Sequence, residues 1–271
     1  MIGQKNLISR IKKQIENHTF PHFCILVGAE GSGKKTLADD IAHMLKNAVI
    51  FSTGISVAEI REMITASYKL ATTTVYIIKD ADTMSEQAKN ALLKVTEEPP
   101  NDAYFIMTLT DINNTLDTIK SRATIYKMEN YTSEEIDAYF KQIVPDASIE
   151  EHNIIIDICE TPGEVQMMHK QKTLEFYDYV ELVVDNIAEV SGANSFKIAD
   201  KIALKADAEG YDLKMFFKVF MSICIKRMHT EPLKYSAGTS VTSKYLKQLG
   251  IRGVNKQMLF DAWIVDMRKV W

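Results

Sequence analysis

The chain has 271 residues, of which 46% are hydrophobic and 25% charged, so we expect a globular protein of more than one domain. A formal net charge of −4 argues against a strong stand-alone nucleic-acid binder, which would normally carry a basic surplus. The N-terminus has no signal-peptide core and no apolar run is long enough to span a bilayer, so we expect a cytoplasmic location without membrane attachment.

The first half of the chain alternates short apolar strands with amphipathic helices. The predicted elements are, in order, a helix at 4–17, a strand at 23–27, a helix at 34–47, a strand at 48–51, a helix capped by Ser56 and Glu59, a strand at 75–78, a helix capped by Thr83 and Glu86, and strands at 104–109 and 124–126. Strands that are apolar on both faces and separated by helices indicate a parallel sheet covered on both sides. This half is therefore predicted to be an α/β nucleotide-type domain.

After Met128 the pattern is helical throughout. Predicted helices begin at the capping pair Thr132 and Glu135 and continue at 149–160, to about 172, and at 174–190, 195–208, 212–229 and 255–270, whereas 231–253 is rich in Gly, Ser and Thr and is predicted to be a loop. We predict an α/β domain over 1–128, a small helical lid over 129–172 and a helical C-terminal domain over 173–271.

A glycine-rich turn follows the first predicted strand. The apolar run 23–27 stops at this turn, and a lysine pair then opens a helix, which is the order of a phosphate-cradling P-loop. Glycines let backbone N–H groups converge on an anion, and the helix N-terminus adds its positive dipole end. The predicted nucleotide-binding residues are Gly28, Gly31, Ser32, Gly33, Lys34, Lys35 and Thr36.

Two lysines stand where a Mg²⁺ site would need ligands. The hydroxyl that should follow Lys34 is replaced by Lys35, and Thr36 comes one place late. In the acidic motif after the strand at 75–78, the metal-side aspartate is replaced by Lys79, with Asp80 next and Asp82 two further on. The sequence predicts a loop that holds a nucleotide, or descends from one that did, without well-ligated Mg²⁺.

Cysteine and histidine patterns predict no metal site. Cys24, Cys159 and Cys224 are far apart inside apolar runs, which is typical of buried reduced thiols. The six histidines share no metal-ligand spacing, and no zinc-type CxxC pair occurs.

Several blocks of the chain resemble AAA+ clamp-loader subunits of the bacterial replicative polymerase, DNA polymerase III, of the delta-prime type. The resemblance rests on Ile2-Gly-Gln4, on 17–22 before the P-loop strand, on 56–68, on Ala88 to Pro100 (AKNALLKVTEEPP) and on 105–111 leading to Ile119-Lys-Ser-Arg122. It implies a P-loop AAA+ sheet flanked by helices, a helical lid and a collar-like helical domain that joins a hetero-oligomeric ring. The zinc module of some clamp-loader subunits is absent, because 46–74 holds no cysteine.

The resemblance also implies roles for residues outside the loop. The family's Ser-Arg-Cys motif supplies an arginine finger to ATP on the neighbouring subunit, and it matches Ser121, Arg122 and Ala123. The sensor residue of the family falls at Leu109 or Thr110, with Thr110 the better candidate. Where hydrolysing members carry a lid arginine, Thr161-Pro-Gly-Glu-Val165 has an acid.

Three functions follow from these patterns. The first is a non-hydrolysing, delta-prime-like stator that holds ATP or ADP passively, offers Arg122 to a partner and meets the sliding clamp and primer–template DNA through the complex. The second is an active AAA+ clamp-loader ATPase, a motor subunit in which Thr36 and Asp80 serve one position out of register. The third is a small-molecule P-loop kinase, for which the Glu97-Glu98-Pro-Pro block and the helical second half have no evident use.

Overall fold

The computed structural model describes residues 3–45, 48–69, 72–100, 102–202, 210–251 and 253–271. They divide into two compact units, one of 1–135 with 161–163 and one of 136–160 with 164–271. The division into domains of 1–128, 129–172 and 173–271 stays a prediction.

The first unit is an α/β layer structure with all five strands parallel. Its helices and strands are α1 (Lys5–Glu16), β1 (Phe23–Val27), α2 (Lys34–Met44), β2 (Val49–Thr53), α3 (Val57–Ser67), β3 (Thr74–Ile78), the 3-10 turn η1 (Ala81–Thr83), α4 (Glu86–Glu97), β4 (Ala103–Leu109), the 3-10 turn η2 (Ile112–Asn114), α5 (Asp117–Lys120) and β5 (Thr124–Lys127). The predicted strands and parallel sheet are therefore confirmed. One local prediction was wrong: Ser85, not Thr83, caps α4, since its hydroxyl accepts from the Ala88 N–H (3.2 Å).

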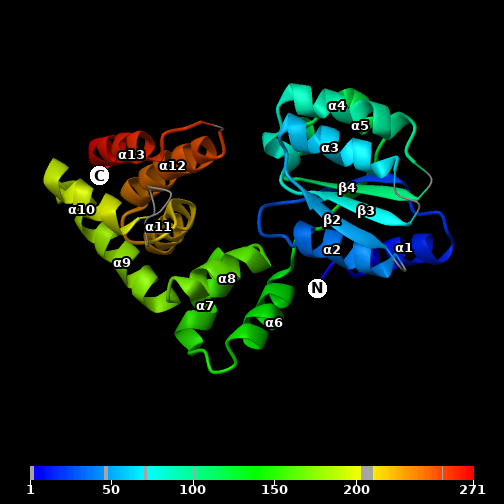
Figure 1. The fold of residues 1–271 in the computed structure, drawn as a ribbon. Coiled ribbons are helices and arrows are strands. Elements are labelled where there is room, and N and C mark those ends of the chain that lie inside the picture. Colours follow the sequence, from blue (N-terminus) through cyan, green and yellow to red (C-terminus); the bar gives the residue numbers. More distant parts are fainter. Residues whose placement is uncertain (1–2, 46–47, 70–71, 101, 203–209, 252) are drawn as a thin grey trace. The chain divides into compact units, whose positions relative to one another are not determined.

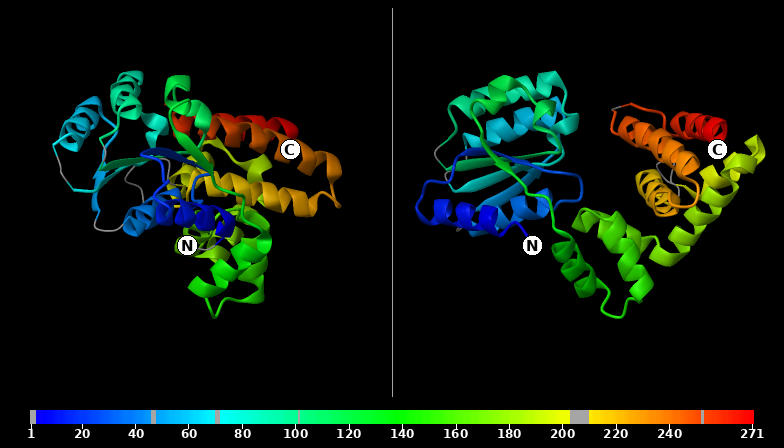
Figure 2. Two further views of the ribbon diagram at one scale, coloured as in Figure 1. Left: turned by 90° about the vertical axis from the view of Figure 1, so that its right-hand side faces the viewer. Right: turned by 180° about the vertical axis from the view of Figure 1, so that it is seen from behind.

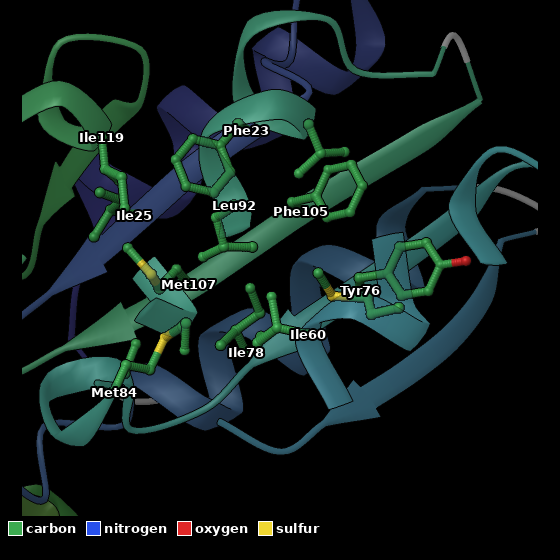
Figure 3. Packing of buried hydrophobic residues seen from close by; sticks show 14 of the residues in the cluster. Phe23, Ile25, Ile60, Tyr76, Ile78, Met84, Leu92, Phe105, Met107 and Ile119 are labelled. Atoms are coloured by element: carbon green, nitrogen blue, oxygen red, sulfur yellow. The ribbon is translucent and has the colours of Figure 1, made fainter. Parts of the chain in front are cut away.

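Helices cover both faces of the sheet because the central strands β1, β3 and β4 are apolar and buried on both sides. The edge strand β2 differs from the expectation, since Val49 and Phe51 are exposed and its last two residues are polar. Figure 1 shows α1 and α2 on one face and α3, α4 and α5 on the other, and the views of Figure 2 show the same layers. In β1, Phe23, Ile25 and Val27 join the core under α3, α4 and α5, while Cys24 and Leu26 join the core under α1 and α2. Figure 3 shows the first of these cores close up, with Leu92 of α4 and Ile60 of α3 packed over the strands.

The strand order places the functional loops together. The sheet runs β2-β3-β4-β1-β5, so β1 lies between β4 and β5 although it comes first in the chain. Val27 at the end of β1 is level with Leu109 at the end of β4, and Met107 of β4 is level with Ile78 at the end of β3. In open parallel sheets, ligands bind outside the carboxyl ends of the strands where the order reverses. The segments after β1, β3 and β4 meet at that edge.

The second unit is built from helices. They are α6 (Ser133–Ile143), α7 (Ile149–Ile158), α8 (Pro162–Lys170), α9 (Thr173–Asn186), the 3-10 turn η3 (Ile187–Glu189), α10 (Gly192–Lys201), α11 (Leu213–Arg227), α12 (Pro232–Leu249) and α13 (Lys256–Val270). The predicted helix at 195–208 is described only as far as 202, and its remainder lies outside the described residues. Among the helices of the described residues, none has the length and apolar character needed to cross a bilayer.

The predicted loop at 231–253 was wrong, because 232–249 form α12. Its buried face consists of Tyr235, Gly238, Thr242 and Tyr245, which recur at helical spacing and pack against neighbouring helices. The small residues allow close approach, as a Cβ on Gly238 would lie 2.2 Å from the Trp271 ring. Low helix propensity is therefore overridden by tertiary packing.

A buried hydrogen bond holds α12 to α13 and gives a test of this packing. The indole Nε1–H of Trp263 donates to the Thr242 hydroxyl (3.0 Å), and both residues are fully buried. Thr242→Val would leave that N–H without its partner, so we expect a loss of about 1–3 kcal/mol in the free energy of unfolding, measured by urea denaturation. Thr242→Ser keeps the hydroxyl and is the matched control. A Val variant as stable as the Ser variant would contradict this role of the hydrogen bond.

Candidate nucleotide site and arginine finger

The glycine loop after β1 is held from several sides. Gly31 and Gly33 have φ of 76° and 89°, in the left-handed region that favours glycine. A Cβ on Gly31 would also lie 2.7 Å from Thr161 Oγ1, and the Gly31 carbonyl accepts from the Gly163 N–H (3.0 Å). The Ser32 carbonyl accepts from the Tyr131 hydroxyl (2.7 Å). The loop is therefore fixed at its glycines and leads into the N-terminus of α2, the end of a helix that favours an anion.

Lys34, the phosphate-binding lysine of the pattern, is turned onto its own loop. Its Nζ donates to the carbonyls of Gly28 (2.7 Å) and Ala29 (2.8 Å), and the residue is 6% exposed. Burial lowers the pKa of Lys34, while the nearby carboxylates of Asp82 and Asp80 act to raise it. An incoming phosphate would have to compete with the two carbonyls for this ammonium group.

The two lysines at the expected metal-ligand positions form ion pairs that join α2 to the end of β3. Lys35 Nζ lies 2.6 Å from Asp80 Oδ2, and Lys79 Nζ lies 3.4 Å from Asp39 Oδ1. These side chains are between 31% and 59% exposed, so the pairs add little to stability. Their electrostatic effect is to cancel the negative charge that would attract a cation. Thr36 is exposed one position further along α2.

The donor set does not fit a Mg²⁺ ion. Mg²⁺ requires oxygen ligands in nearly ideal octahedral geometry, and an ammonium group offers none. Asp80, the first acid of the motif after β3, is engaged by Lys35. Within the described ranges, no three His, Cys, Asp or Glu side chains gather to hold a metal ion of any kind.

Arg122, the proposed finger, lies just after α5, and its guanidinium donates to Glu97, to the Thr118 carbonyl and, more weakly, to the Ser121 hydroxyl (3.5 Å). Its Nη2 lies 2.6 Å from Oε1 of Glu97, the last residue of α4, and its Nη1 donates to the Thr118 carbonyl (2.7 Å). The Ser121 hydroxyl donates to the same carbonyl (3.0 Å). A third of the Arg122 side chain stays exposed.

Thr110 and Leu109 differ in exposure at the end of β4. Leu109 is fully buried in the core, whereas Thr110 is exposed and its hydroxyl donates to Asp82 Oδ1 (2.7 Å). Of the two sensor candidates, Thr110 is the one with a polar group at the site. Glu164, the acid at the expected position of the lid arginine, is bound by Lys218 within the second unit (2.8 Å).

Three features of this site were missed by sequence reasoning: the hydrogen bonds around Asp82, the Glu97 partner of Arg122 and the Asp39 partner of Lys79. None of the three had a local signal: Asp39 lies one helical turn after Lys35 on α2, a spacing that would suggest a pair between these two, yet Asp39 pairs with Lys79 and Lys35 with Asp80. The cysteine prediction is confirmed for the folded state: Cys24, Cys159 and Cys224 are free and buried, and burial raises the pKa of each thiol.

The fold and the loop define a P-loop AAA+ protein. A solved structure with the same fold is a DNA polymerase III gamma subunit-related protein of Thermotoga maritima, with a TM-score of 0.55 at 16% identity, covering 97% of this chain and 99% of that one. The likeness extends over nearly the whole chain, so the predicted fold class is confirmed. At 16% identity, this structural similarity supports a shared fold and says nothing about function.

Sequence comparison narrows the class. Residues 40–132 match the family model of the DNA polymerase III delta subunit. The chain is 29% identical over 180 residues to DNA polymerase III subunit gamma of Buchnera aphidicola (55% of this chain, 50% of that one), and 22% identical over 208 residues to the replication factor C small subunit of Aeropyrum pernix (71% and 63%). The chain is thus related to the AAA+ clamp-loader subunits of bacterial DNA polymerase III. It spans about half the length of the gamma subunits it matches.

Proposed function

We propose that this chain is a clamp-loader subunit of the delta-prime kind, which does not hydrolyse ATP itself and presents Arg122 to ATP bound by a neighbouring subunit. In this function it joins other clamp-loader subunits in a hetero-oligomeric AAA+ ring in the cytoplasm. Through that complex it helps to load the sliding clamp onto primed DNA. Its relatedness to gamma and replication factor C small subunits supports the assignment to this machinery.

The proposal depends on one observation: at the two positions where the motifs call for metal ligands, lysines form ion pairs instead. The side chains of Lys35 and Lys79 stand at the positions where the motif calls for Mg²⁺ ligands, and with Asp80 and Asp39 they form a group of two positive and two negative charges. Phosphoryl transfer depends on that ion to neutralise developing charge. A loop without it can hold ATP or ADP through its amides and Lys34 but has no means to promote cleavage.

Arg122 is suited to act on a partner because its guanidinium is always charged and forked. A fork of this shape matches two phosphate oxygens at once. The contacts with Glu97 and Thr118 hold the guanidinium in place, and a third of the Arg122 side chain remains exposed for the approach of a partner. An active motor subunit would instead need Asp80 for its own metal, and Asp80 is bound to Lys35.

The isolated full-length chain is expected to show no Mg²⁺-dependent ATP turnover above background, because its own loop lacks the cation ligands. Release of phosphate from ATP, measured with and without Mg²⁺, tests this directly. Lys34→Ala is the matched control, since it removes the phosphate-binding lysine. Turnover that requires Mg²⁺ and is abolished by Lys34→Ala would contradict the proposal and favour the motor subunit.

A further inference from the structure

Asp82 is the most heavily hydrogen-bonded carboxylate beside the loop, yet no role in nucleotide binding falls to it. It lies in η1 and is the last acid of the motif that follows β3. Its oxygens accept from the Thr110 N–H (2.8 and 2.9 Å), the Thr110 hydroxyl (2.7 Å), the Asp111 N–H (3.3 Å) and the Asn114 side-chain amide (2.8 Å). One carboxylate thus binds both ends of the segment 110–114.

The hydrogen bonds favour the charged form of this carboxylate. Partial burial acts to raise the pKa of Asp82, but the hydrogen bonds from Asn114, Thr110 and Asp111 outweigh it, and the pKa is lowered. Asp82 is therefore a permanent anion at neutral pH. Bonds to an ionised acceptor are shorter and stronger than neutral ones, so this attachment is firm.

The segment bound by Asp82 leads directly to the finger. Asn114 ends η2, two residues before the N-cap of α5, and Arg122 follows α5 with its N–H bonded to the Ile119 carbonyl (3.1 Å). Ile119 is fully buried in the core under α4 and α5. The chain from 110 to 122 is therefore bound at its start by Asp82, in its middle by the core and at its end by the contact of Arg122 with Glu97.

We propose that Asp82 is a positioning residue for Arg122: a built-in anion that fixes the segment 110–122, so that the finger is set without any nucleotide in the chain's own loop. This inference rests on the proposed function. The Thr110 hydroxyl, which the sensor assignment directs toward a phosphate, here donates to an internal carboxylate. The finger can then serve the partner's ATP whatever the occupancy of Lys34 and the loop.

The first test is made on the isolated full-length chain. Asp82→Asn keeps the shape but removes the charge and replaces one acceptor oxygen by a donor, so amide hydrogen exchange over 110–122 is expected to rise by about tenfold or more relative to the core strands. Asn114→Ala removes one donor only and is expected to give a smaller rise, with little risk to folding. Glu62→Gln neutralises an exposed carboxylate on α3 and is the control. If amide hydrogen exchange over 110–122 is the same in Asp82→Asn as in the control, Asp82 does not fix this segment and the proposal is overturned.

The second test uses the assembled ring in which only the ATPase site adjoining Arg122 is intact. Asp82→Asn is expected to lower kcat by tenfold or more, because a displacement of a catalytic group by about 1 Å can cost about 10²-fold. KM should stay within about twofold, since a residue that only orients the finger removes transition-state stabilisation rather than binding. An unchanged kcat for Asp82→Asn, when Arg122→Ala abolishes turnover, would overturn the positioning role. If Arg122→Ala itself leaves turnover unchanged, the proposed function and the positioning role both fail, and the exchange data still decide whether Asp82 fixes the segment.

Discussion

Replacement of Arg122 by alanine is expected to reduce ATP turnover at the adjoining site of the assembled ring by about 10³–10⁵-fold, the range known for arginine fingers in other phosphoryl-transfer enzymes. The physical reason is the loss of a forked cation that stabilises charge on the transferring phosphate. Arg122 is one-third exposed at the surface of the first unit, so its loss should leave folding and assembly unchanged. Single-turnover hydrolysis in a ring whose other sites are disabled would measure the effect.

Two variants make the Arg122 experiment specific. Arg122→Lys keeps the charge but not the planar fork, so most of the loss should remain. Arg61→Ala removes an exposed arginine from α3 and should leave turnover at the level of the unmodified ring. If a ring assembled with the Arg122→Ala subunit hydrolyses ATP at the rate of the unmodified ring, Arg122 does not act on the ATP of a neighbouring subunit.

The double variant Lys35→Thr with Lys79→Asp is expected to gain a Mg²⁺ dependence of its nucleotide binding. The natural group of four side chains carries two positive and two negative charges, whereas the variant group carries three negative charges and no positive one. Oxygen ligands at both positions suit a hard divalent ion. We expect Mg²⁺ to tighten ATP binding by at least about tenfold, or about 1.4 kcal/mol, in an equilibrium titration with a labelled analogue.

The control for this gain makes the same charge change elsewhere. Lys5→Thr with Lys13→Asp alters two exposed positions of α1 and should leave nucleotide affinity independent of Mg²⁺. If Mg²⁺ changes the nucleotide affinity of the designed variant no more than that of this control, the result would contradict the role given to Lys35 and Lys79.

Much of the fold could be predicted because its signals are local. The central strands β1, β3 and β4 are apolar on both faces, and the capping boxes of Ser56 with Glu59 and Thr132 with Glu135 form as their spacing indicates. The segment 231–253 could not be predicted this way, since its Gly, Ser and Thr residues favour a helix only when packed against α11 and α13. The start of α4 at Ser85 was missed because Thr83 offered an equally good capping pattern.

The motif residues of the candidate site could be predicted from the sequence, but the side chains that contact them could not. The glycine pattern located the loop, and the spacing alone located Lys35 and Lys79. Their pairing with Asp80 and Asp39 depends on the positions of α2 and β3 in space, and the bonds from Thr110 and Asn114 to Asp82 depend on the register of β3 with β4. Such contacts join residues between 28 and 45 positions apart, and no short pattern encodes them.

In the proposed function the ion pairs of Lys35 and Lys79 take the place of metal ligands, so the natural chain should bind nucleotide without help from Mg²⁺. Titration of the isolated chain with a labelled ATP analogue, in excess chelator and in millimolar Mg²⁺, measures this most directly. The structure predicts the same binding curve in both conditions, within about twofold. A curve that Mg²⁺ shifts to tighter binding by tenfold or more would contradict it.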